Sequence, residues 1–403
     1  MQLYRYNLLN SSKEDAEFLK EMAPYLSEHI ESVSLNGSAV DIVYDGTTKE
    51  IIEDKFLNLI SMLEMQSKSN SNMYPSTENI FESMDVVPMN ASNIFPELLK
   101  HKQIFQLNTG SYALSGLLLQ VKKYFELRID ELAKEVFGKS YAVLEMPDLI
   151  PISEYEKGGY FDTFPHHIMF AAELKNDINI IDSFSKKGLC SCFASKGLKE
   201  PKNVLRTAAC MPLYPILRES KFGQNDPGAF VVSGRCFRNE EANVKGLERL
   251  NEFTMKELVL IGDSRQINEF VANASSIWHT WQEIFNLNMR IDTANDSFFV
   301  NNYRALKLFQ LLGNSKRECR LLIPCSDSYL ACSSANFHRT HFTKTYGIRM
   351  EESGKLCHSA CVAFGLERLS YALLSQLGLD VRKWPNTARM EIERLVNLSD
   401  EHE

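Results

Sequence analysis

Hydrophobic positions recur with two different spacings along this chain. From Leu114 to Phe137 they return every three or four residues, which predicts a long helix with one apolar face. Phe230–Arg238 and Phe253–Ile261 are instead rich in β-branched and aromatic side chains, and polar residues separate these two runs. We therefore expect a β-hairpin there. Three further elements are predicted, namely helices over Ile267–Phe285 and Tyr303–Leu312 and a strand over Arg320–Pro324.

The order of these elements indicates the fold class. Strands and helices alternate, but the chain lacks both the short βαβ spacing and the glycine-rich phosphate loop of parallel nucleotide-binding sheets. We expect an α+β fold in which helices flank a mostly antiparallel sheet.

The first part of the chain has a pattern of its own. Two helical stretches, near residues 16–22 and 51–63, enclose two short alternating runs, and Asn36-Gly37 between those runs is typical of a hairpin turn. A polar segment, Gln66–Asn72, follows as a linker. We therefore predict a small N-terminal α+β module with its linker at residues 1–95 and a main domain at residues 96–403.

Charge is unevenly distributed over the 403 residues. The whole chain carries a net charge of −8, whereas residues 1–98 hold six basic and sixteen acidic side chains, a local net charge of −10. Affinity for nucleic acid rests mainly on Lys and Arg side chains that neutralise phosphates. The acidic module therefore argues against tRNA as a partner.

Composition also bears on the cellular location. No run approaches the roughly 18 consecutive apolar residues that a membrane span needs, and the N-terminus lacks a signal pattern. Nine cysteines, an odd number without regular spacing, favour free thiols or metal ligands over disulfides. We expect a cytoplasmic protein with no membrane partner, in which Cys190 and Cys192 are incidental.

Two short motifs indicate a nucleotide site. Phe237-Arg238-Asn239-Glu240 is followed, after a polar loop, by Arg249 four positions before Phe253. This pattern resembles motif 2 of the class II aminoacyl-tRNA synthetases. About 110 residues later, Gly365-Leu366-Glu367-Arg368 opens an apolar-periodic helix that resembles motif 3 of the same superfamily.

The resemblance implies a site that binds a bent ATP and forms an aminoacyl-adenylate. Arginine suits this task because its planar guanidinium binds two phosphate oxygens and keeps its charge. By resemblance, Arg238 is the catalytic residue and holds the α-phosphate and the substrate carboxylate. Arg249 and Arg368 would bind the γ-phosphate, Glu240 would face the adenine amino group, and Phe253 would stack on the purine.

The long helix and the strand after it, Tyr141–Leu144, resemble motif 1, which usually builds the dimer interface of these enzymes. The resemblance thus implies a homodimer. An amphipathic helix in the core of a monomer is the alternative.

A second cluster suggests a metal site. Thr207-Ala208-Ala209-Cys210 stands where ordinary seryl-tRNA synthetases have Thr-x-Glu, and Glu257 and Cys361 accompany it. This combination resembles the atypical, methanogen-type seryl-tRNA synthetases and the amino acid:[carrier protein] ligases. The resemblance spans roughly residues 100–380 and includes three further segments: Gly159–Pro165, Asn295–Phe299 and Ser334–His338.

What the resemblance implies is Zn²⁺ held by Cys210, Glu257 and Cys361, with a fourth position open to the substrate amino group. Thr207, Ala209 and Arg238 would then bind the amino acid. Cys357 and His358 are competing ligands, and a pair of buried thiols beside a salt-bridged glutamate is the alternative without metal. One departure concerns Mg²⁺, because Tyr329–Ser333 lacks the glutamate that class II enzymes usually have there, which leaves Asp327 as a nearby candidate.

The net charge of the N-terminal module and the resemblance together indicate which molecule accepts the activated amino acid. The ligases of this type pass a small amino acid to the phosphopantetheine thiol of a carrier protein. Since the acidic module opposes RNA, we expect activation of glycine, alanine or serine with ATP and transfer to an acyl or peptidyl carrier protein. That partner would dock on the helical insertion between motifs 2 and 3 or on the N-terminal module. A zinc-dependent seryl-tRNA synthetase and a non-catalytic, synthetase-like regulatory protein are the alternatives.

Overall fold

The computed structural model describes residues 1–403 except 9–12, 70–76, 84, 189–195, 295–314 and 398–403. Three expectations lie outside the described residues. These are the helix over Tyr303–Leu312, the segment Asn295–Phe299, and the pair Cys190 and Cys192. Among the described helices, none is both long enough and apolar enough to cross a membrane.

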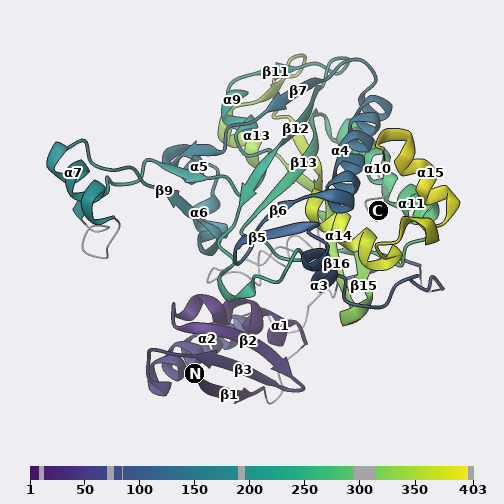
Figure 1. The fold of residues 1–403 in the computed structure, drawn as a ribbon. Coiled ribbons are helices and arrows are strands. Elements are labelled where there is room, and N and C mark those ends of the chain that lie inside the picture. Colours follow the sequence, from purple (N-terminus) through teal and green to yellow (C-terminus); the bar gives the residue numbers. More distant parts are fainter. Residues whose placement is uncertain (9–12, 70–76, 84, 189–195, 295–314, 398–403) are drawn as a thin grey trace.

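An eight-stranded sheet organises the largest part of the molecule (Figure 1). Its strand order is β4-β14-β15-β16-β18-β13-β12-β7, and each neighbouring pair is antiparallel except β12 and β7. The expected hairpin is confirmed as β12 (Gly228–Phe237) and β13 (Glu252–Gly262). The other strands are β4 (Asn79–Glu82), β7 (Ala142–Glu145), β14 (Met289–Thr293), β15 (Lys316–Ile323), β16 (Ser328–Arg339) and β18 (His358–Gly365).

Helices cover one face of this sheet and form the main hydrophobic core with it. They are α4 (Gly116–Phe137), α10 (Ser264–Ser275), α11 (Ile277–Phe285), α14 (Leu366–Leu377) and α15 (Asn386–Leu395). Successive strand side chains point to opposite faces. Leu258 and Val362 therefore enter this core, whereas Glu257 and Cys361 face the other side. The α+β fold expected from the sequence is confirmed, and the sheet face opposite these helices carries the predicted metal ligands Glu257 and Cys361.

The long helix predicted around residues 114–137 is α4, and its apolar face is used inside this chain. Val121, Phe125 and Ile129 are almost fully buried in the core, next to α14, α10 and α15. Gly138 ends the helix in a conformation with φ of 68°, which favours glycine. The single helix expected over Ile267–Phe285 is two helices, which meet at Ser276.

The N-terminal residues build a second, smaller body, drawn in purple in Figure 1. Its sheet has the order β1-β3-β2 and its core is separate from that of the large sheet. Asn36-Gly37 joins β2 to β3, as expected, with Gly37 at a φ of 62°. The elements are β1 (Gln2–Asn7), α1 (Lys13–Met22), η1 (Ala23–Leu26), β2 (Ile30–Asn36), β3 (Ala39–Tyr44) and α2 (Lys49–Ser69).

Two strands in this region were not expected from the sequence. β1 pairs with β3 along the edge of the small sheet. β4 lies within the stretch 1–95 but pairs with β14 of the large sheet. Part of the segment between the two bodies therefore contributes a strand to the larger one.

The remaining elements lie around the large sheet, and α9 (Leu213–Ile216) and α13 (His341–Tyr346) pack over its second face. Another of them, α7 (Ile178–Lys187), stands away from the rest of the molecule in Figure 1 and begins at the capping carboxylate of Asp177. The others are α3 (Phe95–Lys100), β5 (Ile104–Asn108), β6 (Ser111–Leu114), β8 (Leu149–Pro151), α5 (Ile152–Lys157), α6 (Tyr160–Thr163), η2 (Pro165–His167), β9 (Met169–Ala171), β10 (Asn203–Leu205), β11 (Lys221–Phe222), η3 (Glu241–Asn243), η4 (Pro324–Ser326), β17 (Arg349–Met350) and η5 (Val381–Lys383).

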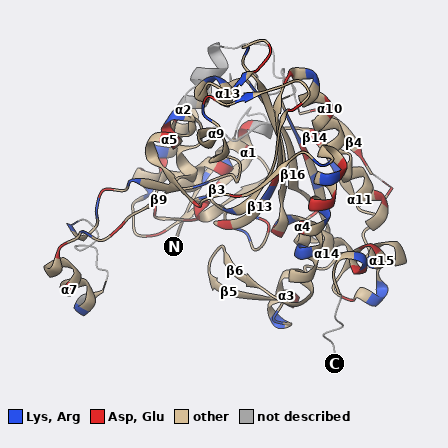
Figure 2. Cartoon of the chain, turned by 90° about the horizontal axis from the view of Figure 1, so that it is seen from above, with Lys and Arg blue, Asp and Glu red and all other residues tan. Residues whose placement is uncertain are grey.

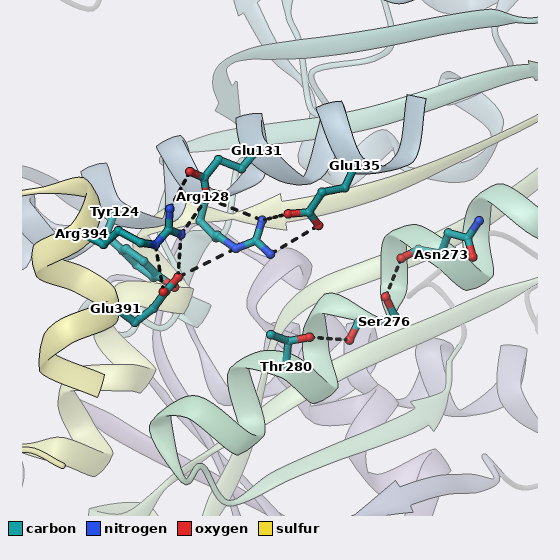
Figure 3. Close-up of polar contacts among 9 residues, drawn as sticks. All are labelled: Tyr124, Arg128, Glu131, Glu135, Asn273, Ser276, Thr280, Glu391 and Arg394. Carbon is teal, nitrogen blue, oxygen red and sulfur yellow. Dashed lines mark hydrogen bonds and ion pairs between the residues drawn. The ribbon is translucent and has the colours of Figure 1, made fainter. Parts of the chain in front are cut away.

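Charged side chains of both signs occur along α4 and α15, as Figure 2 shows. The close-up in Figure 3 shows how they join the two helices. Arg394 on α15 binds both carboxylate oxygens of Glu131 on α4 at 2.7 Å, and its other contact is Glu391 at 3.0 Å. Tyr124 of α4 donates to Glu391 at 3.1 Å. This polar cluster fastens the last described helix to the core.

Candidate active site

The β12–β13 hairpin positions the predicted nucleotide residues. Its register pairs Cys236 with Phe253 and Gly234 with Met255. Arg206 crosses β12 at Gly234, where a Cβ atom would come within 1.6 Å of the guanidinium. Arg206 donates to the carbonyl of Arg235 at 2.6 Å. Glycine is therefore required at position 234, because a buried arginine occupies the space of a side chain.

Arg238 follows directly after β12 and projects toward the second strand. Its Nε donates to the carbonyl of Thr207 at 3.2 Å, and its guanidinium carbon lies 5.2 Å from the centre of the Phe253 ring. Thr207 and Ala209 are buried in the same neighbourhood. The structure therefore brings together the catalytic residue, the stacking aromatic and the two substrate-binding residues predicted from the sequence.

Arg368 lies in the first turn of α14, the helix of the expected motif 3. Its Nε donates to the carbonyl of Glu248 at 2.7 Å, and its Nη1 donates to that of Ala331 at 3.1 Å. Burial lowers the pKa of Arg368, and the charges of Arg249 and Arg238 lower it further. The three predicted phosphate-binding arginines thus lie near one another, and Glu240 among them offsets part of their mutual repulsion.

Arg249 lies between two carboxylates. Glu240, which is 4% exposed, contacts it at 3.2 Å. The second carboxylate is Glu21 of the N-terminal body, 3.1 Å from both Nη1 and Nη2. Glu21 was not predicted from the sequence, because its contact with Arg249 depends on how the two bodies pack together.

Cys210, Glu257 and Cys361 form the one group of metal-ligand type among the described residues. Their ligand atoms all lie within 4.8 Å of one another, and all three residues are buried. Oε1 of Glu257 accepts from the backbone N–H of Cys210 at 2.9 Å, whereas Oε2 has no hydrogen-bond partner. A buried carboxylate oxygen without a partner is costly, so these residues fit a bound cation. The competing ligands Cys357 and His358 are not part of this group.

Electrostatics in this group also favours a cation. The hydrogen bond to Cys361, burial and the charge of Glu257 together raise the pKa of the Cys210 thiol. Acids that repel one another in a buried place keep their protons unless a metal ion replaces them. Two thiolates and one carboxylate match the donors that Zn²⁺ takes in tetrahedral sites with an open position.

His338 on β16 lies beside the metal-type group and was not assigned a role from the sequence. Its Nδ1 is 2.8 Å from the Tyr214 hydroxyl, and its Nε2 is 3.6 Å from Sγ of Cys361. Asn336 donates to the same sulfur at 3.5 Å. If the tyrosine donates to Nδ1, the proton of the ring is on Nε2 and points to the sulfur. These residues orient Cys361.

The expected place for Mg²⁺ has no acid. Ala331 stands there, and its carbonyl accepts from Arg368. Asp327 lies in the turn between β15 and β16, at a φ of 47°. Glu318 of β15 pairs with Ser334 of β16, but Arg320 at 2.6 Å and Lys316 at 3.0 Å neutralise it. The residues at this position therefore do not fit a magnesium site held by a strand glutamate.

Comparison with known proteins agrees with this geometry. A sequence model of the tRNA synthetase class II core domain (G, H, P, S and T) matches residues 193–377. Among solved structures, M. kandleri SerRS in complex with A. aeolicus tRNASec is similar, with a TM-score of 0.69 and 18% identity. The match covers 97% of this chain and 77% of that one. The fold is that of the class II synthetase core.

Curated relatives narrow the class of protein to which the chain belongs. Amino acid–[acyl-carrier-protein] ligase 2 of Bradyrhizobium diazoefficiens is 32% identical over 251 residues, which are 61% of this chain and 73% of that protein. Type-2 serine–tRNA ligase of Methanothermobacter thermautotrophicus is 26% identical over 259 residues, 62% of this chain and half of that protein. This chain belongs to the family of amino acid–[acyl-carrier-protein] ligases, and it is a ligase related to class II tRNA synthetases.

Proposed function

We propose that the protein activates a small amino acid with ATP and transfers it to the phosphopantetheine thiol of a carrier protein. The observation that carries the proposal is the position of three arginines near the β12–β13 loop and the Cys/Glu/Cys group. Arg368 donates to the carbonyl of Glu248 beside Arg249, and Arg238 donates to that of Thr207, three residues before Cys210. A triphosphate and an α-amino acid can occupy these two neighbouring places together. The names of the bacterial relatives support the carrier protein as acceptor.

The first step forms a mixed anhydride. A carboxylate oxygen of the amino acid attacks the α-phosphorus, the bond to the β-phosphate oxygen breaks, and pyrophosphate leaves. Arg238 brings the two anions together and stabilises the charge that develops on the α-phosphate. Arg249 and Arg368 hold the far end of the triphosphate, so that the leaving group is in line. No side-chain nucleophile is required.

The second step transfers the aminoacyl group. The pantetheine sulfur attacks the carbonyl carbon of the adenylate, AMP leaves with the bonding electron pair, and the thiol proton passes to solvent. Adenylate and thioester are both activated acyl groups, so the step needs no other cofactor.

Zn²⁺ would be held by Cys210, Glu257 and Cys361, and when bound it supplies a Lewis-acidic position for the free α-amino group. The chain's own residues bury this place and limit its size. Cys210 and Ala209 are nearly or fully buried, and Tyr214 and Phe342 stack with ring centres 4.3 Å apart beside it. We therefore propose glycine, alanine or serine as substrate. Class II synthetases in general use Mg²⁺ with ATP, and here the triphosphate oxygens themselves would carry that ion.

Pyrophosphate exchange tests the first step. Wild-type protein is incubated with ATP, labelled pyrophosphate and each of the twenty amino acids, and exchange is expected with one or a few small ones. Arg238→Ala should lower exchange by at least about 100-fold, the usual cost of removing a preorganised donor from an activated oxyanion. Near-normal exchange in that variant would refute the role of Arg238.

Transfer of a labelled amino acid then identifies the acceptor molecule. Holo carrier protein should take up the label in a hydroxylamine-sensitive thioester, and the apo carrier, which lacks the pantetheine thiol, should not. The zinc-dependent seryl-tRNA synthetase remains the second candidate, since the M. kandleri structure covers 97% of this chain. Charging of bulk tRNA instead of the carrier would support it. Exchange absent with every amino acid would favour a regulatory protein.

Two finer statements belong to the same proposal. We expect a homodimer, because the long helix and strand of the motif 1 type are both present as α4 and β7. We also expect a cytoplasmic location, since the seven described cysteines are all free thiols. The helices α10 and α11, which lie between the two motifs, bury one face in the main core, and carrier docking on this insertion or on the N-terminal module stays a prediction.

A further inference from the structure

The N-terminal body contacts the nucleotide site at one residue that the proposed chemistry needs. Glu21, in the last turn of α1, places Oε1 3.1 Å from Nη1 and 3.1 Å from Nη2 of Arg249. Arg249 is the residue expected to bind the γ-phosphate. The carboxylate therefore occupies the side of the guanidinium that a phosphate would use.

Neighbouring contacts hold Glu21 in this position. The Tyr25 hydroxyl donates to the carbonyl of Asn239 at 2.9 Å. Asn243 Nδ2 donates to the carbonyl of Glu21 itself at 3.0 Å. Both Asn239 and Asn243 belong to the loop between β12 and β13. The body is thus anchored on the same loop that carries Arg249, and Glu21 is fixed by backbone contacts as well as by charge.

The ring of Tyr25 completes the interface. It packs edge-on against His166 with ring centres 5.0 Å apart, and burial raises the pKa of its hydroxyl far above the ordinary value. These contacts do not involve the guanidinium of Arg249. They can persist when Arg249 changes its partner, so the body need not detach for Glu21 to lose its ion pair.

Charge decides which partner Arg249 takes. Glu240 also contacts Arg249, and Glu21 adds one further negative charge, whereas a γ-phosphate offers more charge than Glu21 and three acceptor oxygens. The same phosphate would also be attracted by Arg368, a buried guanidinium that donates to the carbonyl of Glu248 beside Arg249. AMP lacks a γ-phosphate, so Arg249 should keep its ion pair with Glu21 when AMP binds.

From these contacts we infer that Glu21 is a positioning residue of the nucleotide site: it holds Arg249 in place when the site is empty and yields it to the γ-phosphate of ATP. The inference rests on the proposed ATP-binding role of Arg249. Its consequence is that the N-terminal body tunes affinity for ATP but not for AMP. Glu21 competes with the triphosphate, so its removal should tighten ATP binding.

Calorimetric titration of the full chain with ATP and with AMP, without amino acid or carrier, tests this. Glu21→Gln should lower the Kd for ATP by about threefold to tenfold, the scale of one partly exposed ion pair. The Kd for AMP should stay unchanged. Equal effects on the two nucleotides, no effect, or weaker ATP binding would each overturn the inference. Failure of wild-type protein to bind ATP at all would instead refute the proposed function.

Three further variants make the test specific. Glu17→Gln removes the same charge from an exposed position on α1 and should leave both Kd values unchanged. In an Arg249→Ala background, Glu21→Gln should no longer tighten ATP binding, because the two changes act through one contact. Glu21→Asp is the substitute in case Glu21→Gln folds poorly. Its shorter side chain weakens the contact with Arg249, so it should also lower the Kd for ATP. If Glu21→Gln still lowered the Kd for ATP in the Arg249→Ala background, the result would contradict the mechanism.

Discussion

Glu257 shows how much one buried carboxylate constrains the site. It is fully buried, one oxygen accepts from the Cys210 backbone, and the other has no partner among the described atoms. Leaving one oxygen of a buried carboxylate without a hydrogen-bond partner costs about 1–3 kcal/mol or more. A cation shared with Cys210 and Cys361 removes this cost. The metal is therefore expected to stabilise the fold as well as to bind substrate.

The first prediction concerns Cys361. Cys361→Ser should lower bound zinc, measured by elemental analysis, from about one ion per chain to well below that, because serine is a poor ligand for Zn²⁺. Cys357→Ser is the matched control, since that thiol is also buried but contacts Met350 at 3.4 Å instead of joining the group. Equal zinc content in the two variants would show that Cys361 is not a ligand.

The second prediction concerns His338. We expect His338→Ala to weaken zinc binding by about 10- to 100-fold, the usual effect of removing a hydrogen bond to a metal ligand. Competition with a chromophoric chelator measures this without any assay of activity. Tyr214→Phe removes only the hydroxyl that contacts His338, so a smaller loss is expected. Unchanged affinity in His338→Ala would mean that the imidazole merely fills space near Cys361.

Residues differ in how far the sequence predicts them. Arg238, Arg249 and Arg368 stand in motifs with fixed local spacing, and the structure brings them together. His338 and Glu21 lack such a signal, because neither lies at a characteristic distance from the residue it contacts. Glu21 is 228 positions from Arg249. The Glu21–Arg249 pair forms only because the two bodies of the chain pack together, and sequence spacing does not predict such packing.

At the scale of elements, the α4–α15 contact shows how charged side chains fix the orientation of a helix that packs through its apolar face. Arg394 binds Glu131 through two hydrogen bonds of 2.7 Å, and Arg128 on α4 lies 3.9 Å from Glu391 on α15 (Figure 3). The α15 helix also buries Ala388 and Ile392 in the main core. Its apolar face drives the packing, and the ion pairs fix its orientation.

The third prediction follows from this cluster. Arg394→Ala should lower the free energy of unfolding by about 1 kcal/mol at pH 7, because the pairs are partly exposed and screened. The hydrogen bond from Arg394 lowers the pKa of Glu131 below its usual value. A lowered carboxyl pKa gives stability that is present above the unfolded pKa and lost as the pH falls through the folded one. The difference between wild type and variant should therefore shrink in acid.

Denaturant unfolding at about pH 7 and about pH 3 measures both effects. Arg389→Ala is the control, because Arg389 lies on the same helix and reaches Glu393 only at 3.9 Å. A loss as large in Arg389→Ala would indicate a general effect of helix propensity or charge.

Elements were predictable where their periodicity is strong. The hairpin β12–β13 and the helix α4 were expected within a few residues of their bounds. β1 and β4 were missed, since four to six residues give little periodicity and their identity as strands comes from the partners β3 and β14. The division into residues 1–95 and 96–403 remains a prediction that β4 complicates.

At the scale of the whole molecule, β7 is one of the two edge strands of the large sheet. It ends the eight-stranded sheet, and among the described strands it pairs with β12 alone. Its Val143 is 66% exposed, and Leu127 on the neighbouring long helix is 41% exposed. Exposed sheet edges with apolar side chains tend to be covered by another chain. A second copy is the partner that the motif 1 resemblance implies.

The last prediction is therefore a dimer that uses this edge. Light scattering on a sizing column should give about 92 kDa, twice the 46.1 kDa of one chain. Val143→Lys places a charge on the edge strand and should shift the protein toward the monomer by raising its dissociation constant at least about tenfold, because an unpaired charge would be buried between copies. Ile216→Lys, at a similarly exposed position on α9, should leave the mass unchanged. A wild-type mass near that of one chain at micromolar concentration would contradict the dimer, and equal dissociation in both variants would place the interface elsewhere.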